Sequence, residues 1–165
     1  MEIVYNIEGI ESRATFTFAE NTMNIRNGFY VTLVEQVFKQ MLIKSDASSN
    51  VYTNRPKSLS ESVNDFVVVS MQGSLEDMSA YGECTVNVSL FARDAAGFKN
   101  GNKLNAMQYK ATGQIPISVT VLNKAGLPVQ EYIITQTPDI IGDAPDDYGF
   151  HCRMILFQTT LKVIE

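Results

Sequence analysis

The sequence predicts an α+β fold, in which a mostly antiparallel β-sheet packs against one long amphipathic helix and a short second helix. Residues 84–93 alternate strictly between two sets of side chains, as expected for a strand with one buried face. Residues 65–71 contain a short β-branched run that is typical of a buried strand. Residues 29–44 repeat apolar side chains at helical spacing, which predicts a helix with one broad apolar stripe.

The two predicted central strands are separated by a segment that suits a chain reversal. Residues 72–82 are mostly polar and include Gly73 and Gly82. We therefore expect residues 65–71 and 84–93 to form a long antiparallel hairpin at the centre of the sheet. The face of the second strand that we expect to be buried carries Cys84, Val86, Val88, Leu90 and Ala92.

The N-terminal segment predicts a hairpin that needs a partner. Residues 2–7 and 14–18 have the alternation of short strands, and residues 8–12 between them carry a glycine and two acids. An isolated two-stranded hairpin is barely stable in water, so we expect it to dock on this domain or on a neighbour. Residues 19–28 are polar and irregular, and the long helix follows them.

The middle of the chain predicts short elements separated by polar loops. Residues 51–53 form a short strand that ends at Arg55-Pro56, because proline cannot donate to a strand ladder. Residues 57–64 and 94–102 are loops. The second helix is expected over residues 103–112, and Gly113 fits its end. Its buried face would carry Leu104, Met107 and Ala111.

The C-terminal third predicts a further hairpin and a closing strand. Residues 115–121 and 129–135 are strands joined by a turn at 123–126, and residues 137–149, with two prolines and two glycines, are a long loop. Residues 150–163 form the last strand. Its apolar side chains change parity along its length, which predicts a β-bulge near Gln158.

Chain length, net charge and composition limit the classes to which the protein can belong. A chain of 165 residues fits a single domain, residues 1–165, with residues 1–28 as a candidate N-terminal arm or hairpin extension. The net charge of −5 argues against a free-standing nucleic-acid binder. No apolar run is long enough to cross a bilayer, and the first residues do not resemble a signal peptide. We expect intracellular synthesis, with Cys84 and Cys152 reduced rather than joined by a disulfide.

Three groups of side chains could carry chemistry, and each has a simpler interpretation. Four acids of the late loop could bind a cation, or they could be a solvated acidic loop; these are Asp139, Asp143, Asp146 and Asp147. His151 and Cys152 could form a nucleophilic dyad, but neighbours on a strand point to opposite faces. Phosphate-binding, nucleophile-elbow and zinc-binding motifs are absent from the sequence. We predict no catalytic residue, cofactor or metal ligand.

A sparse set of basic residues in the middle of the chain could line a surface that faces DNA, or could be part of a mixed solvated surface. Phe91 interrupts an otherwise polar strand face, and together with Arg93 it could be an exposed interface anchor. The candidate subunit or lumen contacts are Arg55, Lys57, Phe91, Arg93, Lys99 and Lys103; Lys110 belongs to the same basic set.

From residue 29 onward, the order of elements resembles the tail terminator, or tail-completion, family of bacteriophages. The resemblance begins with the amphipathic helix that ends in a Ser/Asp-rich break. Four segments continue it: residues 51–56 as a short strand and its proline, 66–69 as the next strand, 84–93 as a long strand ending in an aromatic and a basic residue, and 147–157 as the closing strand. The resemblance covers about three-quarters of the chain. Residues 1–28 and the hairpin at 115–135 are additions to the family pattern, and either could reach an adjacent subunit.

The resemblance implies a structural virion protein without catalytic residues. Such proteins form a ring at the head-proximal end of the tail tube, stop its growth and join it to the neck. A hexamer is usual, and a dodecamer would fit the related neck rings of short-tailed phages. The implied partners are the tail tube and neck or portal-adaptor proteins, DNA would pass through the lumen without specific contact, and no membrane is involved. The implied location is the virion, after synthesis in the host cytoplasm.

The rival interpretation is a small intracellular α+β domain that binds a ligand or acts as an enzyme. It would hold a small molecule between the helix and the closing strands, in a deep apolar pocket with converging polar groups. A flat, exposed strand edge would instead favour assembly.

Overall fold

The computed structural model describes residues 2–7, 10–15, 31–77, 81–113, 117–122, 125–134 and 138–163. Within these residues the chain forms nine strands and two helices, which confirms the predicted α+β class. The elements in order are β1 (Glu2–Ile7), β2 (Ile10–Thr15), α1 (Val31–Lys44), β3 (Val51–Tyr52), β4 (Asp65–Asp77), β5 (Tyr81–Arg93), α2 (Gly101–Thr112), β6 (Ile117–Leu122), β7 (Pro128–Ile134), β8 (Asp139–Asp146) and β9 (Phe150–Val163).

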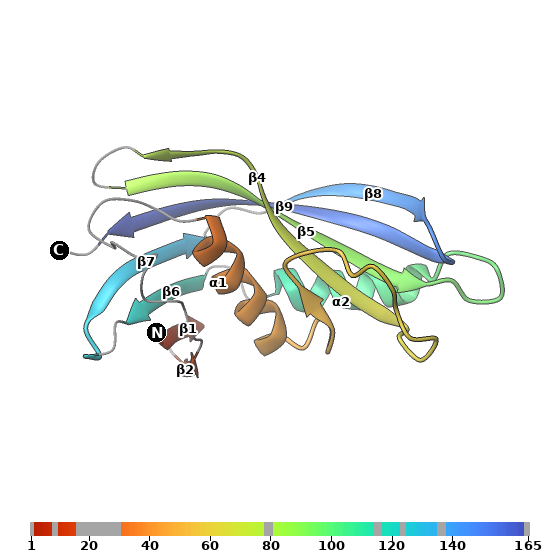
Figure 1. Ribbon diagram of the computed structural model, residues 1–165, viewed down its shortest axis with the longest axis horizontal. Helices are drawn as coiled ribbons and strands as arrows, with labels where there is room; N and C mark the ends of the chain where they lie inside the picture. The colour runs from red at the N-terminus through yellow and green to blue at the C-terminus, as the bar shows by residue number, and fades with distance from the viewer. Residues whose placement is uncertain are drawn as a thin grey trace.

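All the described strands belong to one sheet, and only β3 and β4 pair in parallel, so the sheet is mostly antiparallel as predicted. The strand order is β2-β1-β6-β7-β9-β5-β4-β3, and β8 also pairs with β9. The long strands β4, β5 and β9 run along the molecule, with β8 and α2 towards one end and β1, β2, β6 and β7 towards the other (Figure 1). β9 pairs with β5 along one edge. Along its other edge, β9 pairs with β8 over its first half and with β7 over its second half.

The predicted central hairpin is confirmed, but its strands are longer than the sequence indicated. β4 continues to Asp77 and β5 begins at Tyr81, with a shift of register between Gln72 and Glu76. The polar residues after Met71 were expected to form the turn. Strands pair through backbone hydrogen bonds, so polar side chains alone do not end the pairing. Here β5 is also paired with β9 on its other side.

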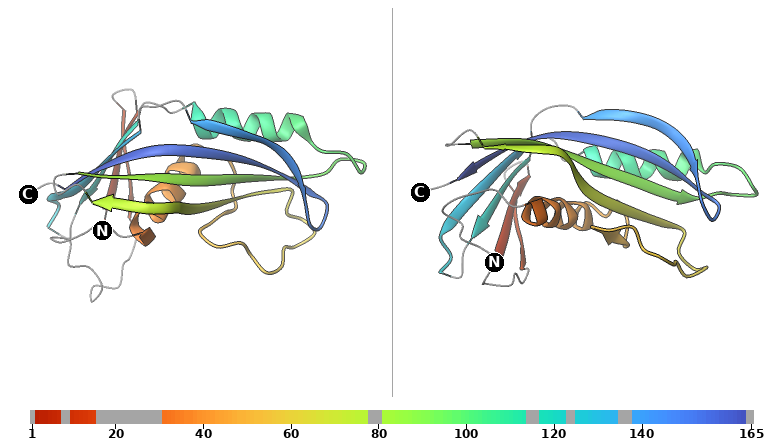
Figure 2. Two further views of the ribbon diagram at one scale, coloured as in Figure 1. Left: turned by 90° about the horizontal axis from the view of Figure 1, so that it is seen from above. Right: turned by 45° about the horizontal axis from the view of Figure 1, so that its top comes forward.

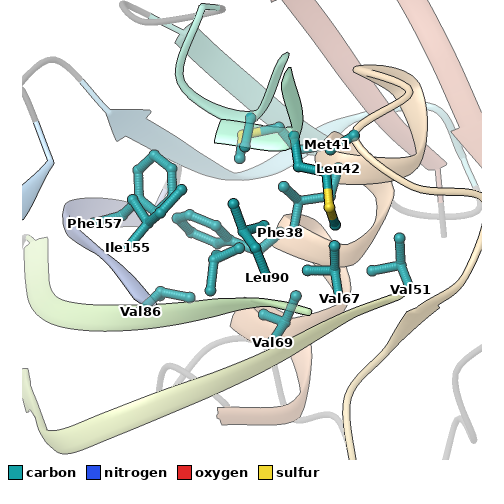
Figure 3. Close-up of a cluster of buried hydrophobic side chains, with 14 of the residues drawn as sticks. Phe38, Met41, Leu42, Val51, Val67, Val69, Val86, Leu90, Ile155 and Phe157 are labelled. Atoms are coloured by element: carbon teal, nitrogen blue, oxygen red, sulfur yellow. The ribbon is translucent and has the colours of Figure 1, made fainter. Parts of the chain in front are cut away.

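One face of the sheet, here called the helix face, packs against α1 and forms the main core. The predicted buried side of β5 is confirmed, since Val86, Val88 and Leu90 are fully buried there. Phe38 of α1 lies over Phe157 of β9, with ring centroids 5.5 Å apart. Figure 3 shows Phe38, Val86, Leu90 and Phe157 converging between the helix and the strands. The described part of the α1 stripe is buried as predicted; it consists of Val34, Val37, Phe38, Met41 and Leu42.

α2 lies on the same face of the sheet, over the end that carries β8 (Figure 2). It begins at Gly101, two residues before the prediction, because the Asn100 side chain accepts a hydrogen bond from the Lys103 backbone N–H at 3.2 Å and caps the helix. The predicted apolar face is confirmed: Leu104, Met107 and Ala111 are buried. α1 has 14 residues and α2 has 12, so the expected contrast between a long and a short helix is slight.

The structure corrects two predictions outside the core. Residues 139–146 form strand β8 rather than a loop. β2 begins at Ile10 rather than residue 14, and its partner β1 also pairs with β6, so the N-terminal hairpin docks on its own sheet. The predicted irregular segment at residues 19–28 lies outside the described residues. No helix in the described parts of the chain is long and apolar enough to span a membrane.

The predicted bulge near Gln158 is wrong. β5 and β9 keep one continuous register from Tyr81 opposite Lys162 to Arg93 opposite Phe150. The change of parity has another cause, because β9 is covered on the outer face at its start and on the helix face further along. Phe150 is buried on the outer face of the sheet, whereas Ile155 and Phe157 are buried on the helix face.

Candidate functional site

Phe91 is buried, which corrects the prediction that it is an exposed anchor. Its side chain is 5% exposed and stacks on Phe66, with ring centroids 4.3 Å apart and planes 3° from parallel. Phe150 meets Phe66 edge-on at 5.2 Å. The segment between β3 and β4 covers this aromatic cluster, since Leu59 and Val63 pack against it. The outer face of the sheet therefore has a second, smaller core at the end near β8.

Two of the predicted contact arginines cover this aromatic cluster from outside. The Arg55 guanidinium carbon lies 5.2 Å from the Phe91 ring centroid, and its Nη1 donates to Asp146 Oδ1 at 2.7 Å. The Arg93 guanidinium carbon lies 4.5 Å from the Phe150 centroid, and its Nε donates to the Val63 carbonyl at 3.0 Å. Planar guanidinium groups stack well on aromatic rings. Both arginines thus serve contacts within the subunit.

The predicted lysines do not gather into one group: Lys103 lines a depression together with Arg93, whereas Lys99 pairs with β8. Lys99 Nζ lies 3.1 Å from Asp143 Oδ2, and Lys103 Nζ lies 2.8 Å from Asp65 Oδ2. Lys57 is exposed and has no ion-pair partner in the described ranges. Most of the basic set is neutralised by a nearby carboxylate, so it does not make a positively charged face.

A partly buried arginine that the sequence reasoning missed joins β8, β9 and α2. Arg153 of β9 makes two bonds to Asp143 of β8, from Nε to Oδ1 at 2.6 Å and from Nη2 to Oδ2 at 2.9 Å. Its Nη1 also donates to Asn105 Oδ1 and Gln108 Oε1 of α2, both at 2.8 Å. The side chains of Arg153 and Asp143 are 13% and 5% exposed. The only sequence signal was an arginine in the mostly apolar first half of the closing strand.

This junction predicts a loss of stability in acid. Hydrogen bonds from the Arg153 guanidinium are the main reason that the pKa of Asp143 is lowered to about 2. Burial acts in the opposite direction, and Lys99 adds to the lowering. Because this pKa is lower in the folded than in the unfolded chain, the ionised carboxylate stabilises the fold above the unfolded pKa of about 4. That stabilisation is lost as the pH falls from about 4 to about 2. We expect the free energy of unfolding, measured with urea, to decrease over this pH range.

The control for the acid prediction is Asp143→Asn. The variant should be less stable than the natural chain at neutral pH, and its stability should fall less steeply between about pH 4 and pH 2. Equal slopes for the two proteins would mean that another carboxylate carries the acid sensitivity.

The margin of the sheet formed by β8 carries an unusual concentration of exposed apolar side chains. Seven large hydrophobic side chains are exposed in the described residues, and four of them lie on β8 or on turns joined to it. These four are Phe98 (77% exposed), Ile140 (42%), Ile141 (41%) and Tyr148 (80%), and we call them the β8 rim. The turn at Phe98 is tied to β8 by the Lys99–Asp143 pair, and the Asp94 N–H donates to the Gly149 carbonyl at 2.8 Å.

Tight turns hold the two aromatic side chains of the rim. Ala95 and Phe98 exchange both backbone hydrogen bonds, at 2.8 and 3.0 Å, around a turn with positive φ at Ala96 (51°) and Gly97 (80°). Tyr148 has φ of 65°, in the left-handed region that costs a non-glycine residue about 1 kcal/mol. The backbone therefore presents both rings in a defined position, at a small conformational cost.

The described residues offer little for covalent or metal chemistry. His151 Nδ1 lies 2.6 Å from Asp94 Oδ1 on the helix face, whereas Cys152 belongs to the cluster on the outer face, so the two cannot form a dyad. Burial raises the pKa of both cysteine thiols to about 11. Of the four candidate acids, Asp143 and Asp146 pair with arginines. Within the described ranges, no three His, Cys, Asp or Glu side chains are grouped as metal ligands.

The described surface has two open depressions near α2. The first, of about 200 Å³, lies between the turn after α1 and one flank of α2, and its walls include Asp46, Asp65, Lys103 and Lys110. The second, of about 350 Å³, lies beside Arg93 and Asn100. Both are open to solvent, and most of their lining residues are polar or charged, unlike the deep apolar pocket that a small-ligand site would need.

Comparisons with known proteins give no family. No family model matches the chain, and no curated protein matches it. One solved structure, whose name states no function, aligns with 84% of this chain and 98% of its own length, at 11% sequence identity and a TM-score of 0.48. A likeness at this level carries no argument about fold or function.

Proposed function

We propose that this chain is a non-enzymatic virion protein that assembles into a ring, as a tail terminator or head–tail connector, and joins the tail to the neck. The β8 rim is the observation that carries the proposal. Four large apolar side chains are exposed along one margin of the sheet, with Ile140 and Ile141 on opposite faces of β8. An exposed strand edge that carries apolar side chains favours association, and aromatic side chains are enriched at protein interfaces.

The chemistry of the chain fits an assembly role. Assembly needs complementary surfaces on two parts of a subunit and requires no nucleophile, metal or cofactor. A hexamer is the assembly we favour and a dodecamer is the alternative; the partners would be the tail tube and neck or portal-adaptor proteins. The basic candidates are mostly paired within the subunit, so we propose that DNA passes the lumen without strong contacts from them.

The test is the mass of the native assembly and its dependence on the rim. We expect the natural chain to give a species six times the 18.3 kDa subunit mass in mass photometry, or twelve times for a dodecamer. Ile141→Lys places a charge in the rim and should abolish that species. Ile43→Lys is the matched control, because Ile43 on α1 is similarly exposed (46% against 41%) but lies outside the rim.

The control variant should assemble like the natural chain. A natural chain that stays monomeric at high concentration, alone and with tail or neck proteins from the same genome, would rule out the ring. Equal loss of assembly in both lysine variants would mean that general surface charge, rather than the rim, controls association.

A further inference from the structure

The start of α2 carries a dipeptide that is prone to spontaneous chemistry. An asparagine followed by glycine readily loses its side-chain amide, because glycine has no Cβ to obstruct its backbone nitrogen. The sequence contains two such pairs, Asn27-Gly28 and Asn100-Gly101, and the second lies in the described residues. Asn100 is the N-cap of α2 and Gly101 is the first residue of the helix, so the geometry of the cap decides whether the pair can react.

The reaction of such a pair is intramolecular. The Gly101 nitrogen attacks Asn100 Cγ, an N–Cγ bond forms, the Cγ–Nδ2 bond breaks, and ammonia leaves with the proton of the Gly101 N–H. Water then opens the cyclic imide at one of its two carbonyl groups. One opening gives aspartate, and the other gives isoaspartate, in which the main chain runs through the former side chain. Nothing is oxidised or reduced, and water is the one co-reactant.

The backbone at Asn100 holds the two reacting atoms apart. The ψ angle of Asn100 is 73°. Because the substituents of a tetrahedral Cα are evenly spaced around the Cα–C bond, this angle places the Gly101 nitrogen nearly opposite Cβ. Ring closure needs the nitrogen and Cβ on the same side of that bond, with the reacting atoms in contact. The pair must therefore rotate by about half a turn before it can react.

Two hydrogen bonds in the first turn of α2 oppose this rotation. Asn100 Oδ1 accepts a hydrogen bond from the Lys103 N–H at 3.2 Å, and the Asn100 carbonyl accepts one from the Leu104 N–H at 3.1 Å. Rotation about the Cα–C bond of Asn100 moves its carbonyl away from the helix, and a side chain turned towards the Gly101 nitrogen leaves the cap. Leu104 is fully buried, so the core also holds this turn.

We propose that Asn100 is a deamidation site that the fold keeps unreactive, and that it reacts only through conformers in which the first turn of α2 has opened. Asn100 is only partly buried and lines the second open depression, so water can reach it once the imide has formed. The extent of deamidation at Asn100 would thus record how often this turn opens. This property of Asn100 does not depend on whether the chain forms a ring.

The two products should affect the subunit differently. Aspartate is as good an N-cap as asparagine, and its charge is favourable at the start of a helix, so α2 should stay in place. Isoaspartate adds a main-chain carbon between α2 and the turn that carries Phe98 and Lys99. Because Lys99 ties that turn to Asp143 of β8, we expect the isoaspartate product to displace Phe98 in the β8 rim.

The first test compares the folded and unfolded natural chain. Peptide mapping by mass spectrometry measures deamidation in mildly alkaline buffer, with and without denaturing urea. We expect Asn100 to deamidate more slowly in the folded chain by about tenfold or more, because the reacting atoms are held out of contact. Equal rates in the two states would overturn the proposal. So would a rate at Asn100 far below that of Asn27 in urea, because local sequence rather than the fold would then suppress the reaction.

A matched pair of variants tests whether the opening of α2 is required. Leu104→Val weakens the buried contact of the first turn, and it should raise the rate at Asn100 in the folded chain severalfold. Leu42→Val is the control, because Leu42 is equally buried but lies on α1, and it should leave that rate unchanged. Both variants keep an apolar side chain, and circular dichroism checks that they fold. No increase in Leu104→Val, or an equal increase in both variants, would contradict a gate at the first turn.

Gly101→Ala tests the chemistry itself. A Cβ at this position would have no atom within 4 Å, so the fold should accept it. We expect the rate at Asn100 in the unfolded chain to fall about tenfold, because the methyl group keeps the nitrogen from its closest approach to Cγ. An unchanged rate would mean that the amide is lost without attack by residue 101, and the proposed site would fail.

Discussion

Replacement of Phe91 by alanine should destabilise the fold by about 3–5 kcal/mol, the usual cost for a buried phenylalanine. The ring stacks on Phe66, meets the guanidinium of Arg55, and is 5% exposed. Its removal would leave a cavity beside Phe66 and Phe150 and would take away the surface on which Arg55 lies. Urea unfolding followed by circular dichroism measures the change.

Phe98→Ala is the matched control, because the Phe98 side chain is 77% exposed. It should change the free energy of unfolding of the monomer by less than about 0.5 kcal/mol. Phe91→Ala should thus lower the stability of the subunit, whereas Phe98→Ala should affect its assembly. A Phe91→Ala protein as stable as the natural chain would mean that the segment between β3 and β4 does not cover the outer face.

Replacement of Arg153 by alanine should cost about 3 kcal/mol, because removal of one partner of a buried ion pair leaves the other charge uncompensated. The change would remove two bonds to Asp143 and leave Asn105 and Gln108 without their donor. Lys99 would remain beside Asp143 and would partly compensate its charge. We therefore expect a loss of stability near the lower end of the range for buried ion pairs. The measurement is again urea unfolding at neutral pH.

Arg153→Lys keeps the charge but loses the planar fork, so we expect an intermediate loss. A double-mutant cycle with Asp143→Asn should give a coupling energy above about 1 kcal/mol, since the two side chains are in direct contact. Additive effects in this cycle would contradict the role that the geometry gives to the pair.

The sequence predicted the elements whose side chains have one buried face. The alternation in β5 and the helical stripe of α1 identified the main core, because periodicity reports directly which side of an element is covered. The apolar face of α2 was predicted residue by residue for the same reason. In each case a local pattern was enough.

Two features depend on segments that are distant in the sequence and could not be predicted in this way. Phe91 is buried because the segment between β3 and β4 crosses the outer face, and nothing near Phe91 in the sequence indicates that path. β8 was predicted as a loop because it is an exposed edge strand without alternation, and it pairs through its backbone with β9.

The candidate site was missed for the same physical reasons. Ile140 and Ile141 lay in the predicted loop, so they were not recognised as part of a sheet margin. The basic candidates were identified singly, whereas their carboxylate partners lie far away in the chain, as with Arg55 and Asp146. Pairing between distant charges is fixed by the fold, and local spacing does not reveal it.

The uninterrupted ladder between β5 and β9 has a mechanical consequence. Thirteen residue pairs hold the two strands in one register, and β9 continues this ladder with β8 at one end and β7 at the other. A force that pulls the ends of the molecule apart along the strands must shear these pairs together, whereas a force across the strands would open them one at a time. The subunit is therefore stiffest along its long axis and yields most easily to a sideways load.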